Sequence, residues 1–293
     1  MRIAIITSDP KLDSSQRLAA AARARGHEVV ALELLRLSIR TSAPRMLYHG
    51  EKIAALDGAL IRLGSVLPGL ALAAGRALEQ DGVALLDSID GLWLARDKME
   101  SLQRLASVGI AVPETELVRD LDQLDGAIER LGGAPVVVKP LHGSQGRGVV
   151  LAENSATAVS MMESVLFQSR EFILQRYIEC GGRDLRMMVV GGEVVAAMER
   201  TAPAGDFRSN LHRGGQAKGI EPAPETAQLA CRAVEALGLC CGGVDVIEGP
   251  GGPWVLEVNG SPGLTGIETV TGIAVAEKMF EVLEQRIREG AHC

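Results

Sequence analysis

The sequence predicts a chain of mixed α/β and α+β class, in which a small parallel-sheet domain precedes two α+β units. Strand, helix and strand follow one another at the N-terminus, which implies a parallel sheet. Around Gly91 the pattern changes to a long helix, and several strand-like runs separated by glycines fill the last part of the chain. With 293 residues and 47% hydrophobic content, the chain is too long for one compact unit. We place the three units at residues 1–90, 91–172 and 173–293.

The first unit opens with "RIAIIT", a buried strand at residues 2–7. A helix at residues 14–26 begins with serine and ends at Gly26, and the strand "HEVVALEL" follows. The loop after the first strand lacks the GxGxxG pattern, so we expect no dinucleotide site there. The remaining elements are strands in "GALIRLG" and "VALLDS", with an alanine-rich helix at residues 70–80 between them.

The second unit begins with one long helix, "LWLARDKMESLQRLASVG", which ends at Gly109 and is followed by Pro113. Strands are expected in "TELVR", "APVVVKP" and "GVVLAE", with helices near residues 121–131 and 155–168.

The third unit is expected to open with the segment "FILQRYIE". Its strands are "DLRMMVVGG", "EVVAAMERT", "CGGVDVIEG" and "PWVLEVNG", and the "GG" between the first two predicts a hairpin turn. Helices at residues 224–237 and 273–288 complete it.

Composition excludes several classes of protein. The formal net charge is −7 without a run of like charge, which argues against a general nucleic-acid binder. The first apolar run has four residues and no later run reaches 18, so we expect neither a secretory signal nor a membrane span. The five cysteines show no CxxC spacing, which is typical of reduced side chains in a cytoplasmic protein.

The segment "KPLHGSQGRGV" places Lys139 at the end of a strand, with Gly143, Gly146 and Gly148 after it. Glycines let backbone N–H groups approach an anion, and a lysine at the base of the loop adds positive charge. The order differs from Walker A, in which the lysine follows the glycines. Two interpretations remain open from these residues: a phosphate-binding loop, or a plain hairpin with a solvated lysine.

Two carboxylates and an amide stand in strand-like apolar runs. Glu257 and Asn259 are two residues apart and project from one face of a strand, and Asp245 is flanked by valines. Oxygen ligands of this kind suit Mg²⁺ or Mn²⁺. The alternative is a set of salt bridges at a strand edge, because a carboxylate in an apolar strand needs a partner or a cation.

A third polar cluster lies in "GDFRSNLHRGG", residues 205–215. Arg208 and Arg213 carry planar donor forks that suit carboxylate or phosphate, and Asn210 and His212 lie between them. A solvated surface loop has a similar composition, and a loop histidine such as His212 is more often exposed than a general base.

These segments occur in one order that resembles a known family. The order is Lys98 in "ARDK", Lys139 before "GSQGRG", "LQRYI", Arg186 in "RDLRMMVVGGEVVAAMER", "RSNLHRGG", Asp245 and "EVNGSPG". Together they resemble the ATP-grasp superfamily and, within it, the RimK family of α-L-glutamate ligases, over essentially the whole chain.

The resemblance implies an ATP-grasp fold of two α+β lobes that hold ATP between them, with the glycine loop as a lid. Residues 1–90 match the pre-ATP-grasp domain, a small Rossmann-like parallel sheet that helps to form the acceptor site. Residues 91–172 match the small lobe, and residues 173–293 match the C-terminal lobe with the metal and substrate sites.

The resemblance also implies roles for single residues. The implied nucleotide contacts are Lys98 and Lys139 on the α- and β-phosphates, the lid residues Gly143, Ser144, Gln145, Gly146 and Gly148, Gln175, Arg176, Tyr177 and Ile178 along adenine, and Asp184 near the ribose. Arg208 and Asn210 match the pair near the transferred phosphate, and Asp245, Glu257 and Asn259 match the metal ligands. Arg186, His212 and Arg213 are weaker candidates for substrate contacts.

Two departures from the family pattern are visible. Arg176 stands where the adenine segment usually has glutamate, but backbone contacts should preserve nucleotide binding. His142 and Arg147 add positive charge to the lid at positions that are acidic or apolar in close relatives, which bears on the identity of the acceptor.

The implied activity is an ATP-dependent carboxylate–amine ligase that adds L-glutamate through an α-peptide bond to a C-terminal carboxylate. The γ-phosphoryl group of ATP would form an acyl phosphate, and ADP and phosphate would be released, with Mg²⁺ or Mn²⁺, two ions by the family pattern, as cofactor. Family acceptors include the C-terminus of a small-subunit ribosomal protein and oligoglutamate, and members are often homo-oligomers, typically tetramers.

Two alternatives are a ligase for a cofactor tail or small peptide, and a nucleotide-binding regulator without catalysis. The presence of Arg208 and of all three metal-ligand candidates argues against the regulator.

Overall fold

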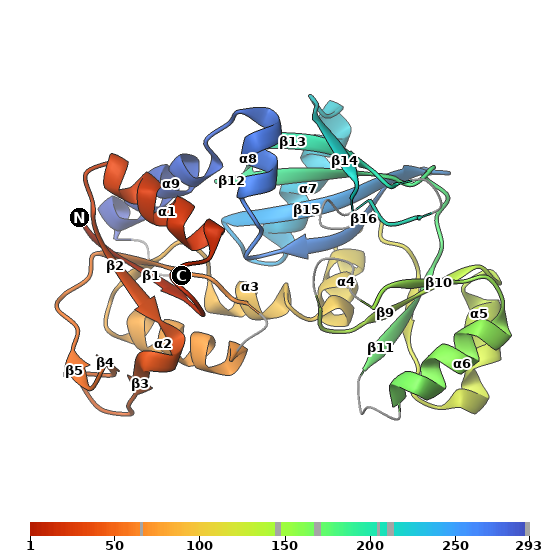
Figure 1. Cartoon of the computed structure of the whole chain (residues 1–293), viewed down its shortest axis with the longest axis horizontal. Coiled ribbons are helices and arrows are strands. Elements are labelled where there is room, and N and C mark those ends of the chain that lie inside the picture. The colour runs from red at the N-terminus through yellow and green to blue at the C-terminus, as the bar shows by residue number, and fades with distance from the viewer. Residues whose placement is uncertain (65–66, 144–147, 167–170, 204–205, 210–213, 291–293) are drawn as a thin grey trace.

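The computed structural model describes residues 1–64, 67–143, 148–166, 171–203, 206–209 and 214–290, and it contains three main sheets arranged along one long axis (Figure 1). The N-terminal domain lies at one end, the C-terminal lobe in the middle and the small lobe at the other end. In the described part of the chain, no helix combines the length and apolar character needed to cross a membrane. The mixed α/β class predicted from the sequence is confirmed.

The N-terminal domain is built on a parallel sheet of order β2-β1-β6-β7. Strand β1 (Arg2–Thr7) pairs in parallel with β2 (Glu28–Glu33) and with β6 (Gly58–Ile61), as the strand–helix–strand pattern predicted. The domain's other elements are α1 (Asp13–Ala24), α2 (Pro68–Gln80), β7 (Ala84–Leu85) and a small antiparallel sheet of β3 (Leu37–Ile39), β4 (Met46–Tyr48) and β5 (Glu51–Lys52). The small sheet was not predicted, because its strands are too short to show a period.

The predicted long helix at residues 92–109 is two helices, α3 (Ile89–Leu94) and α4 (Lys98–Ser107). Asp97 separates them, because its carboxylate accepts hydrogen bonds from the backbone N–H groups of Met99 and Glu100, each at 2.9 Å. This cap makes Lys98 the first residue of α4.

The small lobe carries an antiparallel sheet of order β10-β9-β11-β8. The "FILQRYIE" strand, β11 (Phe172–Arg176), was expected to open the third unit, but it pairs with β9 (Val136–Pro140) and β8 (Thr115–Leu117) instead. Strand partners are a tertiary choice that alternation of side chains along one strand does not reveal. The lobe is completed by β10 (Val150–Ala152), α5 (Leu124–Arg130) and α6 (Ser155–Leu166).

The C-terminal lobe carries a five-stranded sheet of order β14-β13-β12-β15-β16. The predicted Gly191–Gly192 hairpin joins β12 (Arg183–Val190) to β13 (Glu193–Thr201), and both glycines have positive φ, as a tight hairpin requires. The other elements are β14 (Gln216–Gly219), α7 (Pro224–Ala236), β15 (Cys241–Gly249), β16 (Gly252–Asn259), α8 (Thr265–Thr271) and α9 (Val275–Glu289).

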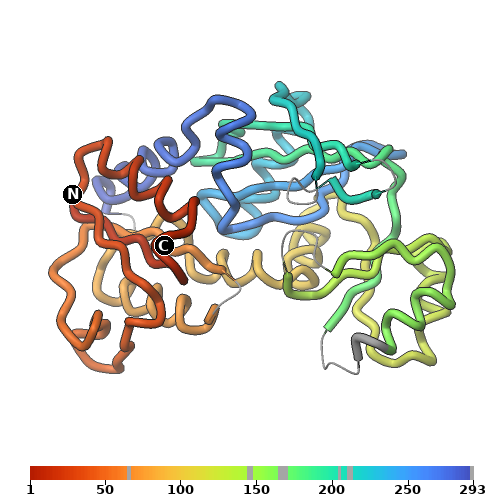
Figure 2. The backbone as a smooth tube through the Cα atoms, in the orientation of Figure 1, coloured from red at the N-terminus to blue at the C-terminus, as the bar shows by residue number. Residues whose placement is uncertain are grey.

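The N-terminal domain and the C-terminal lobe share their hydrophobic cores. One cluster joins Ile3 and Leu18 of the domain to Phe280 of α9, and another joins Ile6 of β1 to Val244 of β15. Helices α3 and α4, which were expected to open the small lobe, pack in this shared core through Leu92 and Leu105. The part of the chain from β8 to β11 has a core of its own and meets α4 in a small cluster of Leu102, Leu141 and Ile173. The backbone trace shows the corresponding separation, with the small lobe set apart from the two packed parts (Figure 2).

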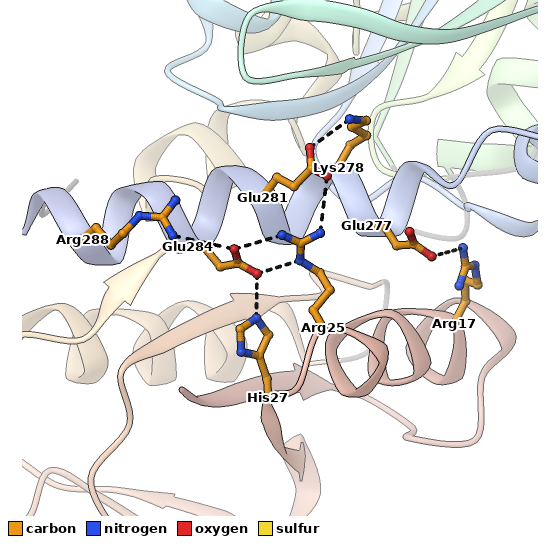
Figure 3. Close-up of polar contacts among 8 residues, drawn as sticks. All are labelled: Arg17, Arg25, His27, Glu277, Lys278, Glu281, Glu284 and Arg288. Carbon is orange, nitrogen blue, oxygen red and sulfur yellow. Dashed lines mark hydrogen bonds and ion pairs between the residues drawn. The ribbon is translucent and has the colours of Figure 1, made fainter.

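A cluster of ion pairs adds to the contact between α1 and α9 (Figure 3). Arg25 donates to both carboxylate oxygens of Glu284, at 2.6 and 2.9 Å, and lies 3.3 Å from Glu281. The His27 ring lies 2.8 Å from the same Glu284 carboxylate. The hydrogen bond from Arg25, which outweighs the opposing effect of burial, lowers the pKa of Glu284 to about 2.

Candidate active site

A cleft of about 970 Å³, part of it open to solvent, lies between the small lobe and the C-terminal lobe. Strands β9 and β11 and the base of the glycine loop form one wall, and strands β12, β13, β15 and β16 form the other. Many of the predicted site residues line it: Lys98, Lys139, Gly143, Gln175, Arg176, Tyr177, Ile178, Asp184, Arg208, Asp245 and Glu257.

Lys139 lies buried at the wall of this cleft. Its ammonium donates to the Gln175 side-chain oxygen at 2.8 Å, and Gln175 in turn donates to the Thr115 hydroxyl at 2.8 Å. Burial lowers the pKa of Lys139 to about 8, which the Glu257 carboxylate only partly offsets. A buried ammonium held by neutral groups favours an incoming anion, so the interpretation as a solvated lysine does not hold.

Lys98 approaches the same loop from the first turn of α4. Its ammonium donates to the Gly143 carbonyl at 3.0 Å and lies 3.5 Å from the Leu141 carbonyl. Two lysines from different elements therefore converge at the start of the glycine loop, which is an arrangement suited to a polyphosphate.

The buried carboxylates of the opposite wall are held by two arginines. Arg186 donates through two nitrogens to Asp245, one of the bonds being 2.6 Å long, and Arg200 lies 3.0 Å from Asp245. Arg200 also forms a two-bond pair with Asp184, at 2.7 and 2.5 Å. Burial would raise the pKa of Asp245, but the two guanidiniums hold it below its usual range.

Asp184 shows the opposite balance, because burial raises its pKa and Arg200 only partly offsets this. Both carboxylates are therefore engaged before any ligand arrives. A ribose contact by Asp184, or a metal contact by Asp245, would compete with these arginines.

Glu257 and Asn259 lie at the end of β16, where the strand is irregular. Asp245 pairs with Glu257 while Val246 pairs with Val255, which leaves Leu256 as an extra residue. Both Leu256 and Glu257 consequently line the cleft. The Asn259 amide donates to the Glu257 carboxylate at 2.8 Å.

The donor set of Asp245, Glu257 and Asn259 fits a hard divalent cation in chemistry, with two carboxylates and one amide oxygen. Within the described ranges no group of three His, Cys, Asp or Glu side chains could hold a metal, so Asn259 would have to serve as the third ligand. Asp245 forms salt bridges with Arg186 and Arg200, although β15 lies inside the sheet and not at its edge. The metal interpretation remains a prediction.

Arg208 spans the cleft. It forms a two-bond pair with Asp206, at 2.8 and 2.9 Å, and donates to the Val149 carbonyl at 2.9 Å, next to the glycine loop. The guanidinium therefore joins the C-terminal lobe to the base of the lid.

The adenine candidates, residues 175–178, run from β11 into the connection between the lobes. The Arg176 side chain lies 3.6 Å from Glu114 and is half exposed. Burial raises the pKa of Tyr177 to about 12, and its hydroxyl donates to Glu179 at 3.2 Å. Burial also raises the pKa of the nearby Cys180 thiol, so it would not act as a thiolate nucleophile.

Several predicted residues cannot be placed. Ser144, Gln145, Gly146, Arg147, Asn210, His212 and Arg213 lie outside the described residues. Sequence reasoning overlooked Arg200, which follows the apolar run of "EVVAAMERT" near the end of β13 and is 5% exposed. The rule applied to Asp245, that a charge inside an apolar strand needs a partner, would have found it.

Comparison with known proteins identifies the family. A model of the RimK PreATP-grasp domain matches residues 1–92, and a model of the RimK-like ATP-grasp domain matches residues 95–283. This chain belongs to the RimK family of ATP-grasp proteins. It is accordingly an ATP-dependent ligase, as the resemblance predicted.

Relatives of this RimK-family ligase match it over nearly their whole length. A probable alpha-L-glutamate ligase of Nitrosococcus oceani is 43% identical over 99% of this chain and 97% of the relative. A protein of the same description from Picosynechococcus sp. is 42% identical over 99% of this chain and 97% of the relative.

Solved structures share the fold of the RimK-family ligase at lower identity. The ATP-grasp ligase PsnB, in complex with its minimal precursor, has a TM-score of 0.76 and 21% identity, covering 97% of this chain and 98% of that one. A RimK domain protein from Sphaerobacter thermophilus has a TM-score of 0.73 and 23% identity, covering 97% and 100%. These likenesses confirm the ATP-grasp fold.

Proposed function

We propose that this RimK-family ligase joins L-glutamate, through an α-peptide bond, to the C-terminal carboxylate of a peptide or protein. The acceptor would be a ribosomal protein or an oligoglutamate chain. The observation that carries the proposal is the convergence of Lys98, Lys139 and Arg208 on one cleft in a chain whose full-length relatives are described as probable alpha-L-glutamate ligases.

A carboxylate does not condense with an amine at neutral pH, because oxide would have to leave. In the proposed reaction the carboxylate oxygen attacks the γ-phosphorus of ATP, which gives an acyl phosphate and ADP. The glutamate amine then attacks the acyl carbon, and phosphate leaves with the bonding electrons as the amine loses its proton. The cleft needs to supply charge stabilisation rather than a nucleophile, and its described lining residues include no histidine.

The residues of the cleft can supply this charge stabilisation. Lys98 and Lys139 would hold the nucleotide phosphates, and Arg208 would stabilise the charge of the phosphoryl group as it moves. Asp245, Glu257 and Asn259 would hold Mg²⁺ or Mn²⁺, two ions by the family pattern, which neutralise phosphate charge when bound. Closure of the glycine loop would exclude water from the acyl phosphate, whose hydrolysis would waste ATP.

The test incubates the purified protein with ATP, Mg²⁺ and L-glutamate, with and without a short α-linked glutamate peptide, and identifies the products by mass spectrometry. We expect glutamate-extended peptides together with ADP and phosphate when both substrates are present, and no ATP turnover with ATP and Mg²⁺ alone. A Lys139→Met variant provides the inactive control. Release of AMP and pyrophosphate, or the absence of extended product, would contradict the proposal.

A further inference from the structure

A second cavity adjoins the nucleotide cleft on the side of the N-terminal domain. The segment after β6, helix α3, the start of α4 and the end of β16 line it, and it shares Lys98, Gly143 and Glu257 with the first cleft. Asn259 lines the second cavity and Asp245 lines the first, so the metal-ligand candidates stand where the two spaces meet. A group bound in the second cavity would therefore lie next to the part of the nucleotide cleft that contains Asp245 and Glu257.

Arg96 is a cation in the wall of this second cavity. Its guanidinium donates to the Gly64 carbonyl at 2.8 Å. This bond uses one of the five N–H donors that the guanidinium carries. Burial lowers the pKa of Arg96, and no described carboxylate forms an ion pair with it. Arg200 and Arg208, which line the neighbouring cleft, differ in this respect, because each is paired with an aspartate.

The wall around Arg96 is fixed rather than loose. The Leu63 N–H donates to the Ser261 hydroxyl at 2.9 Å, which ties the segment after β6 to the end of β16. Gly260 packs so closely against Leu92 that an added Cβ would lie 3.0 Å from that side chain. The guanidinium is therefore held in place between the N-terminal domain and the C-terminal lobe, which lowers the entropic cost of binding an anion there.

His142 also reaches this cavity. It lies 3.9 Å from the Asp97 carboxylate and is 45% exposed. His142 therefore lines the second cavity and not the nucleotide cleft, whereas Lys98 and Gly143 line both cavities.

We propose that the second cavity binds the C-terminal residue of the acceptor and that Arg96 pairs with its carboxylate. This inference rests on the proposed function, which requires a carboxylate next to the γ-phosphate. A partly buried guanidinium without a carboxylate partner is stabilised by an anion, and a carboxylate matches its planar fork. The incoming L-glutamate is the competing occupant, and the test below separates the two.

Calorimetry with ADP and Mg²⁺ present tests the assignment, using α-linked tri-L-glutamate as the acceptor probe. Arg96→Ala should weaken tri-glutamate binding about tenfold or more, since a charged hydrogen-bonded pair is lost. Arg96→Lys keeps the charge without the fork and should restore part of the affinity. Affinity for ADP should stay unchanged in both variants.

Arg104→Ala is the matched control, because Arg104 of α4 likewise donates to a single backbone carbonyl, that of Ala236, at 2.9 Å. Its tri-glutamate affinity should equal that of the wild type. Steady-state kinetics should show the Arg96→Ala effect in the KM for tri-glutamate and not in the KM for ATP.

An active wild type whose tri-glutamate affinity is unchanged by Arg96→Ala would overturn the inference alone. A change confined to the KM for L-glutamate would also overturn it, by assigning the cavity to the amine donor. A wild type that forms no extended product would overturn the proposed function, and the inference would fall with it.

Discussion

The N-terminal domain and the small lobe flank the same C-terminal lobe, but they are attached to it in different ways. The N-terminal domain shares two hydrophobic clusters with the C-terminal lobe. It adds the ion pairs of Arg17 with α8 and of Arg25 with α9, and the contact of His27 with Glu284. The small lobe keeps its own core. Its Leu141 and Ile173 pack against Leu102 of α4, and a few polar contacts add to this.

This difference suggests a division of roles. The N-terminal domain and the C-terminal lobe form one rigid base, which fixes the wall that contains Arg96. The small lobe carries Lys139 and the glycine loop, and we expect it to close over the nucleotide as a separate unit, because few apolar contacts would have to be broken.

Truncation of the shared core should give the largest effect. Phe280→Ala removes a fully buried ring that packs against the N-terminal domain, so we expect a loss of about 3–5 kcal/mol in the free energy of unfolding. Hydrogen exchange should accelerate in β1 and β12 together. Leu141→Ala should instead accelerate exchange in the small lobe and leave β1 unchanged. Equal acceleration of exchange in all three sheets by both variants would show that the small lobe is not a unit separate from the base.

Removal of the buried ammonium in the small lobe should abolish nucleotide use without harming the fold. Lys139→Met keeps an apolar stem and removes a charge that burial disfavours, so the free energy of unfolding should stay equal or rise. The kcat/KM for ATP should fall on the order of 10²–10³-fold. Lys218→Met, at an exposed position paired with Glu199, is the control. An unchanged kcat/KM for ATP in Lys139→Met would remove Lys139 from the site.

Nucleotide affinity should depend on pH through the same residue. The pKa of Lys139 is about 8 in the free protein, because burial lowers it, and bound phosphates favour the charged form. Binding above pH 8 should therefore take up a proton, and ADP affinity should fall by up to about tenfold per pH unit. Calorimetry in buffers of different ionisation enthalpy measures this uptake. A pH-independent affinity between pH 7 and pH 10 would contradict it.

The ion pairs of the base should give the smallest effect. The pKa of Glu284 is depressed from 4.5 to about 2, so its contribution is present above pH 4.5 and is lost as the pH falls towards 2. At pH 7, Glu284→Gln should cost about 1–3 kcal/mol of unfolding free energy. Glu289→Gln is the control, since Glu289 accepts a hydrogen bond from Gln285 on the same helix. A stability difference between Glu284→Gln and wild type that persists at pH 2 would argue against this assignment.

Local pattern was sufficient for several elements. The apolar run at residues 2–7 is β1, and the two glycines at 191 and 192 form the predicted hairpin, because each signal depends on neighbouring residues alone. The family and the fold class were likewise predicted from motifs in their order and are confirmed.

Tertiary choices were not visible in the sequence. The break between α3 and α4 depends on Asp97 capping in the middle of a helical pattern, and the placement of β11 depends on which strands pair with it. The aspartate at 245 could be read as a metal ligand or a salt bridge, because its partners Arg186 and Arg200 stand far away in sequence and meet it only when β12, β13 and β15 assemble.

The most direct measurement of the central claim follows the oxygen atoms of the acceptor carboxylate. Tri-α-L-glutamate labelled with oxygen-18 in its C-terminal carboxylate is incubated with the protein, ATP, Mg²⁺ and L-glutamate, and the released phosphate is examined by mass spectrometry. Because an acyl phosphate breaks between carbon and oxygen when the amine attacks, we predict ADP and phosphate that carries one labelled oxygen. Only the first addition to each peptide uses the labelled carboxylate, so phosphate without any label after a single addition, or AMP with pyrophosphate, would contradict the proposed chemistry.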